Sequence, residues 1–227
     1  GQRFSEAGFV KPKPIVEVGG KPVVEYLIKS FDSNWKFIFC IGEHFKNTEI
    51  EKTILKIKPN SQIIYTKYSE RGPIDTVLAA MPFLSFEESV LVSYCDMALV
   101  WDCNDFKNKV KDYDMAVINY QGFHPSYLGP NTYCHVQVDA NKNEVVRLQE
   151  KKLFTDSIEK EITSAGVYYF KTAELLKEAL NSQLEQNLKY GNEYYTSLAI
   201  QALLNKRDIR VLDYRIDHFV QFGTPED

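Results

Sequence analysis

Apolar positions in the first half of the chain follow two alternating periods. Short continuous apolar runs, typical of buried strands, occupy residues 36–41, 62–66 and 89–94. Between them, apolar residues recur every three or four positions, as in amphipathic helices, at residues 23–31, 47–57 and 74–83. Pro22 and Pro73 stand where two of these helices begin, a position that proline favours. The alternation predicts an α/β fold, a Rossmann-like three-layer sandwich with a mostly parallel mixed sheet.

The second half of the chain is richer in strands. Five segments are predicted as strands: 115–120, 133–138, 145–149, 165–170 and 209–214. A polar turn at 139–143 joins two of them, and helices are predicted at 173–184 and 194–205. Because no repeat, low-complexity tract or linker interrupts the pattern, we expect residues 1–227 to form a single domain.

Length and charge limit the classes of function. A chain of 227 residues can bury one sizeable core, and its net charge of −4 argues against wrapping nucleic acid. The four cysteines lack C-x-x-C spacing, which argues against a zinc site. There is no signal peptide and no apolar run long enough to span a membrane, so we expect a cytoplasmic protein without a membrane partner. The sequence leaves homo-oligomer formation open.

The first 22 residues concentrate glycine, proline and positive charge. Arg3, Lys11, Lys13 and Lys21 lie among four glycines and three prolines, ahead of the first predicted helix. Glycine lets backbone N–H groups approach an anion, and proline fixes the path of a loop. This composition favours a polyphosphate site, although a solvated basic loop would look the same.

Two further segments could carry chemistry. Asp96 follows the apolar run at 90–94, and ligands of open α/β sheets bind at the carboxyl ends of strands. A carboxylate there could bind Mg²⁺ together with substrate phosphates, or it could merely cap a turn. Gly72 and Pro73 open a helix rich in small residues, where a nucleobase could lie against the backbone. The alternative for this segment is an ordinary helix start.

The order of the opening motifs resembles a known family. G-x-R-F, then P-K-P, then G-K-P is similar to the signature loop of the sugar-phosphate nucleotidylyltransferases, in which Gly1 would be the last glycine of the loop. The resemblance implies a GT-A-like fold, with Arg3 and Lys13 as catalytic residues. It also implies that the chain begins inside the motif, with the family's apolar first strand missing from its N-terminus.

The same resemblance assigns nucleotide and metal contacts. It implies nucleotide binding by Gly1, Gln2, Gly72 and Pro73, and Mg²⁺ binding by Asp96. The family's closing motif has an aspartate before G-T-P as a second metal ligand, whereas this chain has Gln221 there. An amide oxygen is a neutral and weaker ligand, so either one carboxylate suffices, another acidic group substitutes, or activity is lost. We interpret Gln221 as a subfamily trait and expect it beside the metal.

Three residues of the second half are matched to the acceptor. Lys151, in Glu150-Lys151-Lys152, would contact the acceptor phosphate, although such a segment is otherwise a solvated strand end. Gly166, in a segment resembling the family's N-A-G-I-Y-x-F strand, would let a sugar approach the backbone. Glu193 would reach substrate hydroxyls, or would simply favour a helix N-terminus.

The implied activity is nucleotidyl transfer in nucleotide-sugar and polysaccharide biosynthesis. A nucleoside triphosphate and a phosphorylated acceptor, foremost a sugar 1-phosphate, would give a nucleotide-activated product and pyrophosphate, with Mg²⁺ as cofactor. One alternative is a catalytically silent module that binds nucleotides or sugar phosphates. Another is a glycosyltransferase of the same fold, but Asp96-Met97-Ala98 lacks the second aspartate of a D-x-D metal motif.

Overall fold

The computed structural model describes residue 4 and residues 6–224, which fall into two compact units. Unit 1 comprises residues 1–68, 94–103 and 218–227, and unit 2 comprises residues 69–93 and 104–217. The chain therefore leaves unit 1 twice and returns to it twice. The predicted contacts of Gly1, Gln2 and Arg3 lie outside the described residues.

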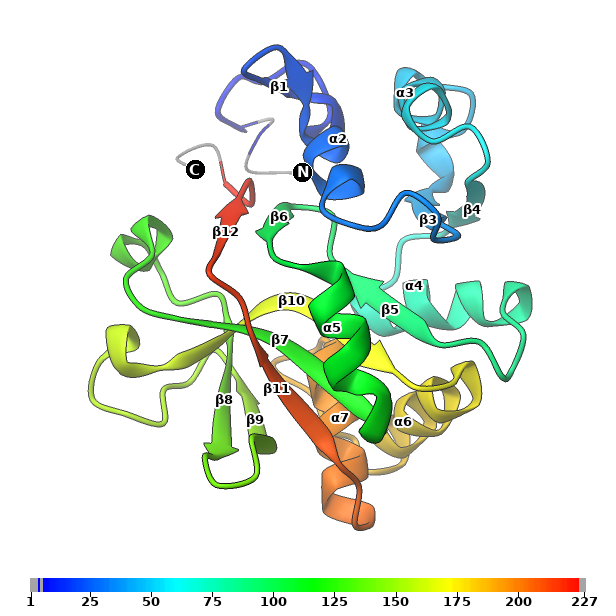
Figure 1. The fold of residues 1–227 in the computed structure, drawn as a ribbon. Coiled ribbons are helices and arrows are strands. Elements are labelled where there is room, and N and C mark those ends of the chain that lie inside the picture. Colours follow the sequence, from blue (N-terminus) through cyan, green and yellow to red (C-terminus); the bar gives the residue numbers. More distant parts are fainter. Residues whose placement is uncertain (1–3, 5, 225–227) are drawn as a thin grey trace. The chain divides into compact units, whose positions relative to one another are not determined.

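In the residues that the structure describes, the elements of unit 1 are three pairs of strands, the helices α2 and α3 and two short 3₁₀-helices (Figure 1). The 3₁₀-helix η1 (Lys13–Ile15) precedes the hairpin of β1 (Glu17–Val18) and β2 (Lys21–Pro22), which leads into α2 (Val23–Lys29). The parallel pair β3 (Ile38–Gly42) and β4 (Gln62–Thr66) is joined through the 3₁₀-helix η2 (Glu43–Phe45) and α3 (Glu49–Ile57). The antiparallel pair β6 (Met97–Val100) and β12 (His218–Gln221) joins two segments far apart in the sequence.

The start of unit 1 is fixed by local chemistry. Gly19 and Gly20 both have positive φ, as the two central residues of a tight hairpin turn require. The apolar faces of α2 and α3 then meet over η1, where Ile15, Val24 and Ile54 are almost completely buried. This core holds the glycine- and proline-rich opening segment against the first helix.

Unit 2 is built on a six-stranded sheet in the order β5-β10-β7-β11-β9-β8. Its strands are β5 (Val90–Ser93), β7 (Met115–Gln121), β8 (Cys134–Asp139), β9 (Glu144–Glu150), β10 (Ile162–Phe170) and β11 (Val211–Arg215). Its helices are α4 (Pro73–Ala80), α5 (Cys103–Lys109, starting at the end of unit 1), α6 (Ala173–Glu185) and α7 (Thr196–Lys206). Short 3₁₀ turns are η3 (Met81–Phe83), η4 (Val110–Asp112), η5 (Pro125–Leu128) and η6 (Ile158–Lys160).

The sheet of unit 2 is mixed, as predicted, but its pairing is mainly antiparallel. Within it, β7 and β11 are parallel, and the other described pairs are antiparallel. The short polar turn between β8 and β9 allows only a hairpin, whereas parallel neighbours need a long crossover. Because β8 also pairs with β10, five strands close on themselves as a barrel. The α/β class is confirmed, and the mostly parallel sheet is corrected.

Helices cover both faces of this sheet (Figure 1). On one face, the ring of Phe106 in α5 lies edge-on to Tyr169 and Tyr214, with centroids 5.6 Å and 5.0 Å away. On the other face, α6 and α7 pack together and against β10, with Leu176, Leu180 and other apolar side chains fully buried. Central strand residues 115–118 are completely buried. The main hydrophobic core of unit 2 therefore lies around the central strands of this sheet, between the sheet and its helices.

Every strand and helix named from the pattern has a counterpart in the structure, with ends shifted by a few residues. The pattern missed the short strands β6 and β12, the β1–β2 hairpin and α5. Among the described residues, none of the helices combines the length and apolar character needed to cross a bilayer.

Candidate active site

Lys13 is held by the rigid opening segment of unit 1. It begins η1 between Pro12 and Pro14, and proline fixes the backbone φ on both sides. Ile15, two residues later, is only 4% exposed and anchors the turn in the core. The backbone of Lys13 therefore has little freedom, while its side chain stays partly accessible.

The side chain of Lys13 meets Asp96. Its Nζ lies 2.6 Å from Asp96 Oδ2, and the two side chains are 15% and 28% exposed. Lys13 Nζ also lies 3.5 Å from the carbonyl oxygen of Gly223 and 5.9 Å from the ring centre of Phe4. The structure thus brings the predicted triphosphate lysine and the predicted metal ligand into direct contact, 83 residues apart in sequence.

The closing motif of the chain lies at the same place. Asp96 directly precedes β6, and β12 pairs with β6 so that Gln221 stands opposite Met97. The N–H of Phe222 donates to the carbonyl of Asp96 at 2.7 Å, and the buried Phe222 ring packs on Tyr26. The strand that carries Gln221 therefore runs beside the segment that begins at Asp96.

The donors present at Asp96 fit a cation that the substrate also binds. Among the described residues, no group of three or more histidine, cysteine or acidic side chains could enclose a metal. Mg²⁺ usually takes one or two carboxylates and completes its shell with phosphate oxygens and water. The single carboxylate of Asp96 meets that pattern, and the metal role of Asp96 and Gln221 stays a prediction.

In unit 2, Gly72 and Glu193 are packed against each other. Gly72 is the N-cap of α4, with φ 77° and ψ −148°, a conformation almost confined to glycine. A Cβ atom on Gly72 would lie 2.9 Å from the Cβ of Glu193. Backbone hydrogen bonds join the same segments, because Tyr194 N–H donates to Arg71 and Ile74 N–H donates to Tyr194. The segment at Gly72, expected at the nucleobase, is thus packed directly against the segment at Glu193, expected at the acceptor.

Lys151 lies beside the Glu193 segment. Its Nζ donates to the Tyr195 hydroxyl at 2.7 Å and lies 4.7 Å and 5.1 Å from the ring centres of Tyr195 and Tyr190. The Tyr195 hydroxyl donates in turn to the carboxylate of Glu193. Neither tyrosine was predicted from the sequence, although Tyr195 stands two positions after Glu193. The structure brings Lys151, Glu193 and Gly72 together through these contacts.

Glu150 precedes Lys151 and is buried at the end of β9. It is 5% exposed, and the Ser197 hydroxyl of α7 donates to it. Burial raises the pKa of the Glu150 carboxyl to about 7, although the Ser197 hydrogen bond and the charge of Lys151 oppose this shift. The Glu150 carboxyl, next to Lys151, therefore has a pKa near neutral pH.

Gly166 occupies a β-bulge in β10. Its φ is 70°, and the register against β7 shifts between Ser164 and Val167. Its N–H donates to the Ser164 hydroxyl at 3.1 Å, and the residue is buried. The conformation explains the glycine on structural grounds, and its predicted contact with a sugar stays a prediction.

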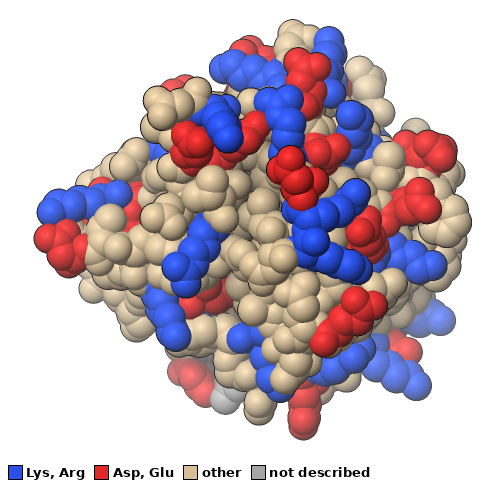
Figure 2. Space-filling view, turned by 90° about the horizontal axis from the view of Figure 1, so that it is seen from below, with Lys and Arg blue, Asp and Glu red and all other residues tan. Residues whose placement is uncertain are grey.

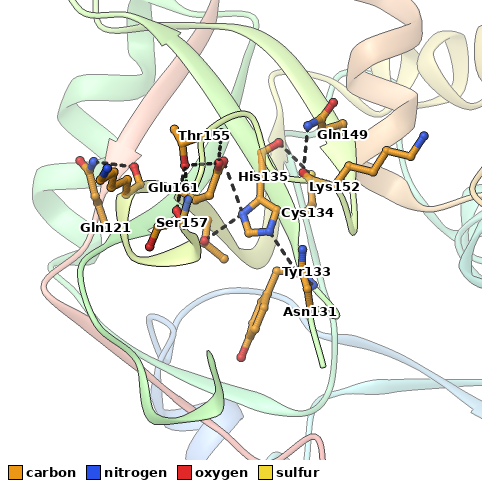
Figure 3. A network of polar contacts seen from close by, with 12 residues as sticks. Gln121, Asn131, Tyr133, Cys134, His135, Gln149, Lys152, Thr155, Ser157 and Glu161 are labelled. Atoms are coloured by element: carbon orange, nitrogen blue, oxygen red, sulfur yellow. Dashed lines mark hydrogen bonds and ion pairs between the residues drawn. The ribbon is translucent and has the colours of Figure 1, made fainter. Parts of the chain in front are cut away.

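A buried polar network ties the loop after Lys151 to the barrel (Figure 3). Glu161 accepts hydrogen bonds from the N–H and hydroxyl of Thr155 at 2.5 Å and 2.7 Å. His135 contacts Asn131 at 3.0 Å and Thr163 at 3.2 Å, and burial lowers its pKa. These bonds fix the path of the chain between β9 and β10.

Charge is finely mixed on the face shown in Figure 2, where lysine and arginine side chains alternate with acidic ones. Ion pairs among the described residues include Arg207 with Glu178 at 2.9 Å and Arg210 with Glu144 at 2.7 Å. The pattern agrees with the near balance of 27 basic and 31 acidic residues in the chain.

Comparison with known proteins identifies relatives of the chain. The bifunctional protein GlmU of Methanocaldococcus jannaschii is 26% identical over 189 residues, covering 81% of this chain and 41% of that protein. The glucose-1-phosphate cytidylyltransferase of Salmonella typhimurium is 46% identical over 44 residues, covering 18% of this chain and 17% of that protein. The chain thus spans less than half the length of these relatives.

The fold is shared with a solved structure, the nucleoside-diphosphate-sugar pyrophosphorylase from Vibrio cholerae RC9. The two agree with a TM-score of 0.76 at 20% identity, over 99% of this chain and 93% of the other. This agreement confirms the α/β nucleotidyltransferase-like fold. The model of one family, described as the MobA-like NTP transferase domain, matches residues 1–161. Since this match covers more than half of the chain, the protein belongs to the family of MobA-like NTP transferase domains.

Proposed function

We propose that the protein transfers a nucleoside monophosphate from a nucleoside triphosphate to a phosphorylated acceptor, foremost a sugar 1-phosphate. An oxygen of the acceptor phosphate attacks the α-phosphorus, the bond to the β-phosphate oxygen breaks, and pyrophosphate leaves. The observation that carries the proposal is the contact of Lys13 with Asp96 at 2.6 Å. The named activities of the cytidylyltransferase and the pyrophosphorylase support it.

In unit 1, the proposed roles concern the triphosphate. Lys13 and Asp96 neutralise each other without substrate, and a triphosphate with its cation offers each of them a stronger partner. Lys13, with Arg3, then holds phosphate oxygens by charge-assisted hydrogen bonds, and Asp96, with the neutral Gln221, holds Mg²⁺. The cation would supply charge neutralisation to the phosphates. Gly1 and Gln2 are proposed to bind the same nucleotide.

In unit 2, the proposed roles concern the base and the acceptor. Gly72 and Pro73 present the start of α4 to the nucleobase, and Lys151 binds the acceptor phosphate. Glu193 and Gly166 are proposed to receive acceptor hydroxyls. The packing of Gly72 on Glu193 supports this assignment, because it holds the two segments at a fixed spacing.

The acceptor phosphate is itself the nucleophile, so no covalent enzyme intermediate is required. The protein has to position two anions and to stabilise the charge that develops on the α-phosphate and the departing pyrophosphate. Fixed cations such as Lys13 perform this task. We further propose that the chain acts as a single Rossmann-like catalytic domain of GT-A type. We place its activity in the cytoplasm, in nucleotide-sugar and polysaccharide biosynthesis. Self-association of the chain remains open and can be measured.

Pyrophosphate release from a matrix of triphosphates and phosphorylated acceptors tests the proposal. With the best pair, Lys13→Ala should lose about 10- to 100-fold in turnover, since a hydrogen bond to a charged group is worth roughly 1.5–3 kcal/mol. Lys11→Ala is the matched control, because Lys11 lies in the same loop but pairs with Glu17 at the surface. Equal turnover of the two variants would refute the role of Lys13. Triphosphate binding without pyrophosphate release from any pair would instead indicate a silent binding module.

A further inference from the structure

We propose that Tyr195 is a positioning residue that holds the ammonium group of Lys151 toward the acceptor phosphate while separating it from the carboxylate of Glu193. The inference rests on the proposed function and extends it to a residue that neither the sequence pattern nor the family comparison assigns. It is carried by the chain of contacts from Lys151 through Tyr195 to Glu193.

The backbone of Lys151 is held in an unusual conformation. Its φ is 55°, in the left-handed region that a residue with a side chain adopts at a cost. Its N–H donates to the carbonyl of Tyr133 at 2.7 Å, directly before β8. The backbone therefore turns sharply at Lys151. As a result, the Lys151 side chain points in a different direction from the one it would have if strand β9 continued.

The ammonium group of Lys151 has N–H donors that its contact with Tyr195 does not use. It has three N–H groups, and one of them points to the Tyr195 hydroxyl at 2.7 Å. The π-faces of Tyr195 and Tyr190 stabilise the positive charge without using a hydrogen bond. Among the described residues, Tyr195 is the only hydrogen-bond partner of this ammonium group, so two N–H donors remain for the oxygens of a phosphate.

Tyr195 itself is firmly fixed. It is the N-cap residue of α7, and its carbonyl accepts a hydrogen bond at 2.9 Å from the side-chain amide of Gln183, which is completely buried. The residue before it, Tyr194, is bonded through its backbone to the segment at Arg71 and Ile74. A lysine side chain bonded to this hydroxyl loses little further entropy when a phosphate binds.

The hydroxyl of Tyr195 acts as a neutral spacer. It donates to the Glu193 carboxylate and accepts from the Lys151 ammonium, so the hydroxyl stands between these two charged groups. Burial, followed by the Glu193 hydrogen bond, raises the pKa of Tyr195, so its hydroxyl keeps the proton that this order of donors needs. In unit 1 the arrangement is different, because Lys13 pairs with the Asp96 carboxylate itself. Lys151 consequently remains an available cation.

Replacing Tyr195 with phenylalanine tests the inference. Tyr195→Phe keeps the ring and the backbone cap and removes only the hydroxyl. We expect the dissociation constant for glucose 1-phosphate, measured by calorimetry, and the KM of the acceptor to rise about tenfold. The KM of the triphosphate should change less than twofold. Tyr194→Phe is the matched control, because the Tyr194 hydroxyl donates to Asn187 at 2.6 Å on the surface, and this variant should leave all three constants unchanged.

A double-mutant cycle separates positioning from a general structural effect. In a Lys151→Ala background, Tyr195→Phe should have almost no further effect on glucose 1-phosphate binding, since the group that it positions is gone. Equal loss in both backgrounds, or an unchanged dissociation constant in Tyr195→Phe alone, overturns the inference. So does a wild-type protein that binds neither glucose 1-phosphate nor inorganic phosphate at millimolar concentration. If the binding pattern holds but no pair of substrates releases pyrophosphate, the inference stands and the proposed function falls.

Discussion

Replacing Gly72 with alanine should destabilise unit 2 through two separate effects. At φ 77° and ψ −148° a residue with a Cβ atom is strained, which costs about 1–3 kcal/mol. The new Cβ would also lie 2.9 Å from the Cβ of Glu193, 3.2 Å from its Cγ and 3.5 Å from its Cα. Cα belongs to the backbone and Cβ is bonded directly to it, so side-chain rotation cannot move these two atoms away, and such overpacking costs about 1–3 kcal/mol.

Thermal unfolding of Gly72→Ala measures the sum of the backbone strain and the overpacking against Glu193. For a loss of about 3 kcal/mol in a protein of this length, the melting temperature should fall by roughly 6–12 °C. Gly191→Ala is the matched control: Gly191 has φ 58° in the same region of unit 2, but a Cβ atom there would have no heavy atom within 4 Å beyond its chain neighbours. It should show only the backbone strain of about 1 kcal/mol, which is roughly 2–4 °C.

The difference between the two glycines is the decisive result. If Gly72→Ala and Gly191→Ala lower the melting temperature equally, the contact with Glu193 has no energetic weight and does not fix the spacing of the two site segments. Backbone strain alone can make Gly72→Ala the more damaging by up to about 2 kcal/mol. An excess greater than about 2 kcal/mol therefore shows that the packing of Gly72 on Glu193 is present in solution.

Two further predictions concern single carboxylates. Asp96→Asn should reduce pyrophosphate release by at least about tenfold and weaken its Mg²⁺ dependence, because a neutral amide is a poor ligand for a hard cation; full activity with an unchanged Mg²⁺ requirement would remove Asp96 from the site. Glu150 keeps a proton in the folded protein up to about pH 7, whereas an unfolded chain releases it near pH 4.5. Stability should therefore fall by about 3 kcal/mol as pH rises through this window, at about 1.4 kcal/mol per pH unit. Glu150→Gln should abolish this loss in urea melts at pH 5 and pH 8, and parallel pH profiles of the two proteins would contradict it.

Local sequence patterns were sufficient for most elements of the fold. The helix at α3 follows from apolar residues at Ile50 and Ile54 on one face, and both are 1% exposed in the core of unit 1. The strand at β7 follows from its continuous apolar run, which is completely buried. By contrast, β6 and β12 are four residues each and pair only with one another among the described strands, across more than 100 residues of chain. A short strand stabilised by so distant a partner leaves little local signal.

In the candidate site, too, some residues could be predicted from local sequence patterns and others could not. Its charged and glycine residues could be selected from motifs, because Lys13, Asp96 and Gly72 stand in recognisable local contexts. Tyr190 and Tyr195 could not, since aromatic residues are common in the chain and their value here depends on the position of Lys151. A role that consists of contact between distant residues has no local pattern.

The amino-acid sequence by itself determined the order of helices and strands, the α/β class and the cationic opening loop, because these depend on periodicity and on the chemistry of neighbouring residues. The tertiary structure decided the antiparallel pairing and closure of the sheet in unit 2, the Lys13–Asp96 pair and the Lys151–Tyr195–Glu193 chain. Each of these joins segments far apart in the sequence, and their free energy comes from packing and hydrogen bonds that exist only after the chain has folded.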